Sequence, residues 1–103
     1  MLANLEVVPV TVHINNGMGG ATLVAYPMSE SGNITHVVDA RQVLISVAQC
    51  SEKDHYDRKL GRNLAISRAA DEGFVLRFPK KFCEMHKIQM LRQMAAIYAG
   101  FVH

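Results

Sequence analysis

A predicted helix in the middle of the chain carries the residues best suited to bind a ligand. Arg58 and Arg62 lie one helical turn apart along one margin of this helix, and Arg68 lies on the other margin. The strip between the margins has almost no side chain and consists of Gly61, Ala65 and Ala69. Each guanidinium group offers five N–H donors in a rigid fork that suits phosphate oxygens. A helix of a partner subunit, a planar anionic ligand such as a nucleotide, or water alone would fit against such a strip. The ligand hypothesis assigns binding to Arg58, Arg62, Gly61, Ala65, Arg68 and Tyr56.

The remaining chemistry-bearing side chains do not combine into a recognisable catalytic or metal site. Cys83 and His86 fall on neighbouring turns of a predicted helix, but a structural zinc ion takes four ligands and the sequence has no second close pair. The carboxylates Glu52, Asp54 and Asp57 fall at a predicted helix start, where capping and the helix dipole account for them. We therefore expect no enzymatic activity, no metal ion and no cofactor.

The helix that positions the arginines is expected over residues 51–70, with a capping-box pattern at its start. Tyr56, Leu60 and Leu64 recur on one side at helical spacing, and we expect this side to be buried against a sheet. The strip of small residues would then be exposed on the other side. Gly73 is expected to end the helix in a left-handed conformation.

The first half of the chain shows the alternation of apolar and polar residues that is typical of β-strands. Strands are expected over residues 5–14, 22–26, 34–38 and 42–49, and residues 74–78 alternate well enough to form a fifth. The glycine-rich segment at residues 15–20 predicts a hairpin, and the apolar run at residues 43–48 predicts a central strand covered on both faces. The sequence thus predicts one α+β domain over residues 1–103, with an antiparallel sheet of four to five strands in its first half. This sheet would pack against one central basic helix and one C-terminal apolar helix.

The C-terminal helix, expected from about Lys80 to Gly100, is apolar over most of its circumference. One apolar stripe consists of Met90, Met94, Ile97 and Phe101, and the other of Leu91, Ala95, Tyr98 and Val102. A sheet needs only one stripe, and a chain of 103 residues has little material left to cover the second. We therefore expect a homo-oligomer that assembles through this helix.

Composition places the chain among folded intracellular proteins. Half of the residues are hydrophobic and 19% are charged, which excludes a disordered chain. The net charge of +2 is modest and does not by itself imply binding to nucleic acid. The two cysteines, Cys50 and Cys83, are expected to be reduced thiols rather than a disulfide framework. The sequence shows neither a signal-peptide pattern nor an apolar run of membrane-spanning length. We expect a cytoplasmic protein without a membrane partner.

The segment at residues 50–69, entered from an apolar strand, is similar to a segment of small phage proteins and resembles the Thoeris anti-defence sponges that trap cyclic ADP-ribose signals. The resemblance covers about a fifth of the chain. It implies a β-sheet core with C-terminal helices, assembly into dimers or larger oligomers, and a location in the host cytoplasm. It also implies that Arg58 and Arg62 contact ligand phosphates, while the aromatic contact to the base would fall to Tyr26 or Tyr56.

Two functions of different classes follow from these residues. The first is a non-enzymatic protein that sequesters a phosphorylated, cyclic nucleotide signal as a phage anti-defence protein. The alternative is a small regulator that binds nucleic acid or a host protein through the basic helix at residues 51–70. Binding to several nucleic-acid phosphates would show a steep dependence on salt, because each neutralised phosphate releases counterions, whereas a pocket for one small ligand would show a shallow dependence.

Overall fold

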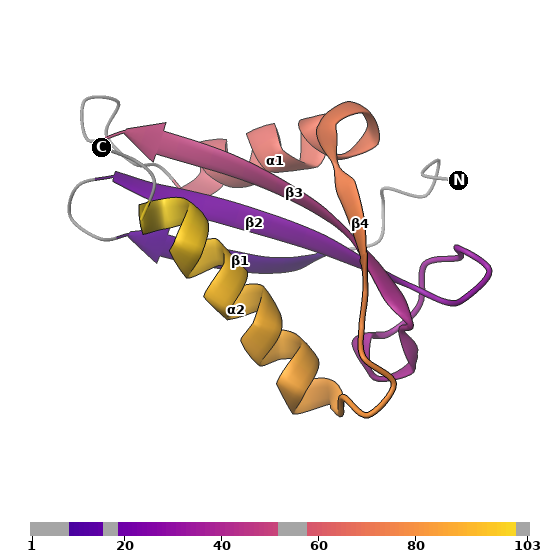
Figure 1. Ribbon diagram of the computed structural model, residues 1–103. Helices are drawn as coiled ribbons and strands as arrows, with labels where there is room; N and C mark the ends of the chain where they lie inside the picture. Colours follow the sequence, from indigo (N-terminus) through magenta and orange to yellow (C-terminus); the bar gives the residue numbers. More distant parts are fainter. Residues whose placement is uncertain (1–8, 16–18, 52–57, 101–103) are drawn as a thin grey trace.

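A computed structural model describes residues 9–15, 19–51 and 58–100. The described elements follow one another as β1 (Val10–Asn15), β2 (Gly19–Met28), η2 (Val37–Asp39), β3 (Gln42–Ser51), α1 (Arg58–Glu72), β4 (Phe74–Arg77) and α2 (Glu84–Gly100). Figure 1 shows α1 above the sheet and α2 below it. The predicted α+β class is therefore confirmed, with one helix on each face of the sheet.

The sheet has four antiparallel strands in the order β1-β2-β3-β4. β2 and β3 pair along ten residues each, from Gly19 opposite Ser51 to Met28 opposite Gln42. The apolar run in β3 therefore forms a central strand, as its sequence predicts. β1 and β2 form the predicted hairpin, and β4 adds the short strand expected near residue 74.

One predicted strand, at residues 34–38, is wrong. Ile34 forms only an isolated bridge with Met28, and the chain then turns through the 3-10 helix η2. The backbone N–H of Arg41 donates to the Met28 carbonyl, which returns the chain to the sheet just before β3 begins. The β-branched residues in this segment favour a strand. In the structure, its backbone groups instead form hydrogen bonds within a turn, from Asp39 N–H to the His36 carbonyl and from Ala40 N–H to the Val37 carbonyl.

Side chains along the central strands alternate between two hydrophobic clusters, because successive residues of a strand point to opposite faces. The cluster below the sheet joins Leu23, Ala25, Val43 and Ile45 to Leu91 and Ala95 of α2. The cluster above the sheet joins Val24, Tyr26, Met28 and Leu44 to Ala65 and Ala69 of α1. Each face of the sheet is thus covered by one helix, and the core is divided into two layers.

The side of α1 that faces the sheet is the strip of small residues, which corrects the sequence prediction. Ala65 and Ala69 are buried, whereas Leu60 and Leu64 are 65% and 37% exposed. The face of β2 and β3 that is turned toward α1 already carries the large ring of Tyr26. A helix can approach such a face closely only through small residues, because interiors are close-packed and larger side chains would overfill the layer.

Both ends of α1 also differ from the prediction. Ser51 is the last residue of β3 and does not begin a helix, and residues 52–57 lie outside the described residues. At the other end, Gly73 does not adopt a left-handed conformation; among the described glycines the positive φ, 88°, belongs to Gly32. A Cβ at position 73 would collide with the carbonyl oxygen of Ala69 and lie 2.9 Å from Cδ1 of Leu44. Close approach to α1 and β3, rather than backbone handedness, requires the glycine.

α2 begins at Glu84, four residues later than expected, and only one of its two apolar stripes is buried. Leu91 and Ala95 lie in the core, Met94 is half-buried, and Ile97 is 58% exposed. Among the described residues, neither helix has the length and hydrophobicity of a membrane-spanning segment.

Candidate functional site

α1, which carries the arginines, does not expose the strip of small residues that the sequence predicts to be open. Ala65 of α1 is buried against the sheet and is not available as a surface for a ligand, and Gly61 is half-buried. Arg62 and Arg68, both half-buried, flank the buried strip at helical spacing. Tyr56 lies outside the described residues, as does the side chain of Arg58. The structure therefore places Arg62 and Arg68 on opposite flanks of α1 without a bare strip between them.

Tyr26 lies beneath α1 and is electrostatically coupled to Arg62. Its side chain is fully buried, and its hydroxyl group has no hydrogen-bond partner within the part of the chain that the structure describes. Burial raises the pKa of Tyr26 above its ordinary value of 10.0, and the nearby positive charge of Arg62 opposes this shift. The phenol is thus held neutral in the upper layer of the core, and it serves there as packing for α1.

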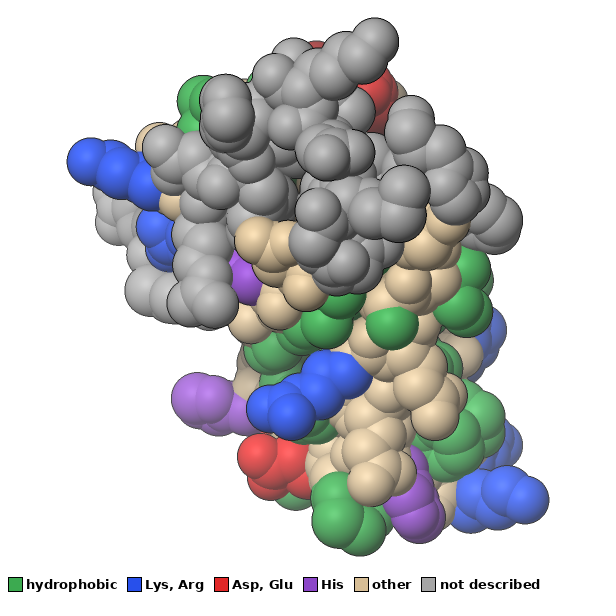
Figure 2. Space-filling model, turned by 90° about the vertical axis from the view of Figure 1, so that its left-hand side faces the viewer, with side chains coloured by type: hydrophobic (Ala, Val, Ile, Leu, Met, Phe, Trp, Pro, Cys, Tyr) green, Lys and Arg blue, Asp and Glu red, His purple; other side chains and the backbone are tan. Residues whose placement is uncertain are grey.

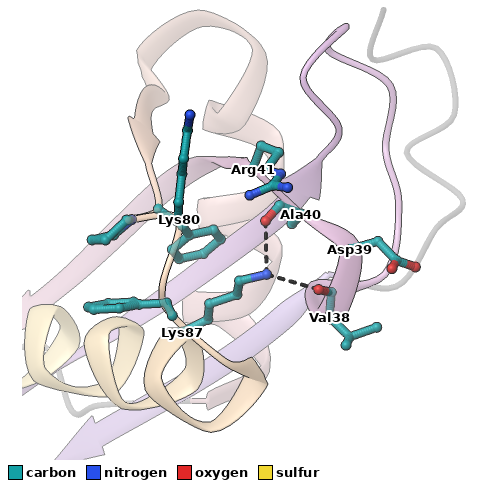
Figure 3. A pocket seen from close by; sticks show the side chains of 9 residues that line it. Val38, Asp39, Ala40, Arg41, Lys80 and Lys87 are labelled. Atoms are coloured by element: carbon teal, nitrogen blue, oxygen red, sulfur yellow. Dashed lines mark hydrogen bonds between the residues drawn. The ribbon is translucent and has the colours of Figure 1, made fainter.

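A polar pocket of about 270 Å³ lies between η2 and the connection from β4 to α2 (Figure 3). Its walls are formed by Val38, Asp39, Ala40, Arg41, Phe78, Pro79, Lys80, Phe82 and Lys87. Three of these side chains are cations and one is a carboxylate, so the lining carries a net positive charge. Basic groups from distant parts of the chain therefore line one cavity here.

Lys87 fixes the floor of this pocket. It is 5% exposed, and its ammonium group donates to the carbonyl oxygens of Val37, Val38 and Ala40 at 2.8, 3.0 and 2.8 Å. The ammonium nitrogen also lies 5.4 Å from the centre of the Phe78 ring. All three donors of the ammonium are therefore used, and the charge is balanced by carbonyl dipoles and a ring face. Lys87 joins α2 to η2 and so holds the two walls of the pocket together.

Arg41 and Lys80 are the cations that remain available to a ligand. Both are exposed, and neither side chain forms a hydrogen bond or ion pair with another residue in the described part of the chain. Figure 3 shows the Arg41 guanidinium between Lys80 and Ala40, while the carboxylate of Asp39 points away from the ammonium of Lys87. Arg41 and Lys80 both line the pocket, and the Lys80 side chain extends away from the ammonium of Lys87 (Figure 3).

A neighbouring carboxylate neutralises only part of this charge. Glu30 pairs with Arg77 at 2.7 Å, and this hydrogen bond, followed by the charge of Arg77, lowers the pKa of Glu30. Arg41 and Lys80 lower that pKa further, so both lie within electrostatic reach of Glu30. One carboxylate thus faces three cations, and Arg77 already occupies it.

This pocket is not apparent from the sequence, because its residues come from segments about forty positions apart and because backbone carbonyls hold Lys87 in its floor. One signal was present. Lys87 falls on the same helical stripe as Leu91, Ala95 and Ala99, so a lysine stands in a row of buried positions. A lysine is rarely buried without partners, and such a position indicates a specific polar site.

Cys83 and His86 have the spacing of half a zinc site, for which the sequence predicts no metal ion. Cys83 is a free, exposed thiol, and His86 contacts the ring of Phe82 with centroids 5.5 Å apart. The described residues contain no group of three or more side chains able to hold a metal ion.

Comparisons with protein-family models, with curated proteins and with solved structures found no match to the chain.

Proposed function

We propose that this protein binds a small phosphorylated ligand, of the nucleotide class, without transforming it, and that the ligand occupies the pocket between η2 and α2. The observation that carries the proposal is the pair of cations Arg41 and Lys80, which line one cavity and form no ion pair with a carboxylate among the described residues. The proposal moves the phosphate contacts from the α1 arginines to this pocket.

The chemistry of the lining fits a phosphate group. A guanidinium can donate two parallel hydrogen bonds to phosphate oxygens, and an ammonium adds a point charge. Hydrogen bonds to charged partners contribute about 1.5–3 kcal/mol each. Phe82, which is half-buried at the rim, offers an apolar surface for a sugar or a base.

The volume restricts the size of the ligand. Pockets for drug-sized molecules measure about 300–1,000 Å³, so a cavity of about 270 Å³ lies just below that range. A phosphate with its sugar, or a mononucleotide with its base at the rim, would fill the cavity. A larger cyclic nucleotide would extend over the surrounding basic surface at Arg77 and Lys81, both of which are exposed.

Calorimetric titration with 5′-mononucleotides, 3′,5′-cyclic nucleotides and cyclic ADP-ribose tests the proposal. We expect one site per chain, and we expect Arg41→Gln and Lys80→Gln each to weaken binding at least tenfold. Arg68→Gln, which removes a half-buried arginine on the opposite face of the sheet, is the matched control and should change the affinity less than twofold.

Three outcomes would contradict the proposal. One is the absence of binding by any member of the panel. Another is a loss of affinity in Arg68→Gln that exceeds the loss in Arg41→Gln, because that result would return the site to α1. The third is binding to nucleic acid alone with a steep salt dependence, which would favour the regulator that binds through the basic helix.

A further inference from the structure

The side of α2 that faces away from the sheet carries unusually little charge. Lys87 points inward, which leaves Glu84 and Arg92 as the charged side chains on the rest of the helix. Met85 and Ile97 are 60% and 58% exposed. Figure 2 shows hydrophobic side chains among scattered basic, acidic and histidine side chains on the lower half of the molecule, where Figure 1 draws α2. A typical chain is about a quarter charged, with those residues concentrated on its surface, so this side of the helix is short of charge.

A shallow surface groove runs along one flank of α2, between the buried stripe and the side that faces away from the sheet, and its charges have opposite signs at its two ends. It has a volume of about 560 Å³ and is lined by Glu84, Met85, Ile88, Gln89 and Arg92. Glu84 and Arg92 are eight residues apart, which corresponds to about 12 Å along a helix axis. They are therefore too far apart to pair within one helix, and neither forms an ion pair with any other described residue.

We propose that this groove binds the same groove of a second copy of the chain, with the two α2 helices antiparallel. A two-fold axis beside Ile88, the midpoint of the groove, would bring Glu84 of each chain opposite Arg92 of the partner subunit. An interface with two-fold symmetry requires that residue i meets residue j and that j meets i, and a groove with opposite charges at equal distances from its centre satisfies this condition. The charge pattern of the groove is thus complementary to itself.

The apolar residues of the groove fit the same arrangement. Along α2, Met85 lies between Glu84 and Ile88, where the two-fold axis would pass. In the antiparallel pair it would contact Ile88 of the partner subunit and the aliphatic stem of Arg92 of the partner subunit. The ion pairs would set the register, while burial of Met85 and Ile88 would supply the contact area.

This interface revises the one that the sequence predicts. The predicted interface includes Leu91, which is fully buried against the sheet, and Phe101, which lies outside the described residues. The proposed interface instead uses the face at Met85 and Arg92. It does not depend on the pocket at Arg41, so its failure would leave the ligand proposal standing.

Charge reversal tests the register, with sedimentation velocity measuring self-association of the full chain at 1–200 μM. We expect a dimer for the unmodified chain, and we expect Glu84→Arg and Arg92→Glu each to weaken dimerisation at least tenfold, because each change places two like-charged pairs in the interface. The double variant E84R/R92E should return the dissociation constant to within threefold of the unmodified value. Glu72→Arg, an exposed position on α1 across the sheet, is the matched control and should leave the dimer unchanged.

Mixing the two single variants gives the sharpest test. A chain carrying E84R and a chain carrying R92E should each be monomeric alone and should form a heterodimer when mixed, because both ion pairs are then restored across the interface. Circular dichroism of each variant checks that it is folded, and Glu84→Gln and Arg92→Gln replace any reversal that prevents folding, with weaker dimerisation expected for each. A monomeric unmodified chain at 200 μM, dimerisation that is insensitive to the single changes, or single variants that stay monomeric when mixed would each overturn the proposal.

Discussion

Replacing Lys87 with Met removes the ammonium group that joins α2 to η2 while it keeps most of the side-chain volume. The ammonium donates to three carbonyl oxygens, so the substitution leaves three acceptors without their donor. We expect Lys87→Met to destabilise the folded protein and to loosen η2.

The expected loss follows from the surroundings of each carbonyl. Three hydrogen bonds from a charged donor, at about 1.5–3 kcal/mol each, set an upper limit. The bonds to Val37 and Val38 are only partly buried, and Val38 is 56% exposed, so water can replace the ammonium there. The bond to Ala40 is buried, and its loss leaves an unsatisfied acceptor that costs about 1–3 kcal/mol. We therefore expect a loss of about 2–4 kcal/mol in the free energy of unfolding, equivalent to a fall in Tm on the order of 10–30 °C for a domain of this size.

Urea denaturation followed by circular dichroism measures this free energy. Lys81→Met, at an exposed position six residues earlier, is the matched control and should change stability by no more than about 0.5 kcal/mol. The opposite outcome has its own physical cause, because burying an ammonium costs several kcal/mol and an apolar replacement can relieve that cost. If Lys87→Met is as stable as the unmodified protein, the reasoning that the three carbonyl contacts outweigh desolvation is refuted.

Three further substitutions test the packing and the charges. Tyr26→Phe removes a buried hydroxyl that has no partner among the described residues, so urea denaturation at pH 7 should show equal stability or a gain of about 1–2 kcal/mol. Because the folded pKa of Tyr26 is raised, the unmodified protein should also lose stability as pH rises above 10.0. If Tyr26→Phe loses the same amount of stability over this pH range, the loss does not come from ionisation of Tyr26. Gly73→Ala places a methyl group against the carbonyl of Ala69 and should cost about 1–3 kcal/mol in the same assay, a prediction that an unchanged midpoint would refute. Since the folded pKa of Glu30 is lowered by Arg77, their pair should stabilise the protein above pH 4.5 and less as pH falls, so the difference in Tm between the unmodified protein and Glu30→Gln should shrink on acidification rather than grow.

The strands were predictable because their side chains alternate with a period of two. The apolar run in β3 identifies a strand buried on both faces, and the glycines before β2 identify the hairpin. The segment at η2 has the same kind of residues, and its pairing was decided by backbone contacts to β2 that no side-chain pattern encodes.

The buried face of α1 was not predictable from hydrophobicity alone. Leu60 and Leu64 form the more hydrophobic stripe, while Ala65 and Ala69 form the smaller one. The choice depended on the volume already occupied by the facing sheet, where Tyr26 contributes a large ring. Hydrophobic patterning indicates that a helix has a buried side, but fit to the opposing layer decides which side it is.

The candidate site illustrates the same limit. Arg41 precedes β3, Lys80 follows β4, and only the antiparallel pairing of these two strands brings them to one end of the sheet. Sequence spacing therefore identifies the arginines that are close together on α1, whereas Arg41 and Lys80 become close only through strand pairing.

We propose that the pocket at η2, and not the arginine face of α1, holds a phosphorylated ligand. Titration of the ¹⁵N-labelled protein with a 5′-mononucleotide, followed by backbone amide chemical shifts, tests it most directly. We predict saturable shift changes at the amides of Asp39, Ala40, Arg41 and Lys80, with little change along α1. Changes centred on Arg62 and Arg68, or no saturable change at a millimolar concentration of the nucleotide, would contradict the claim.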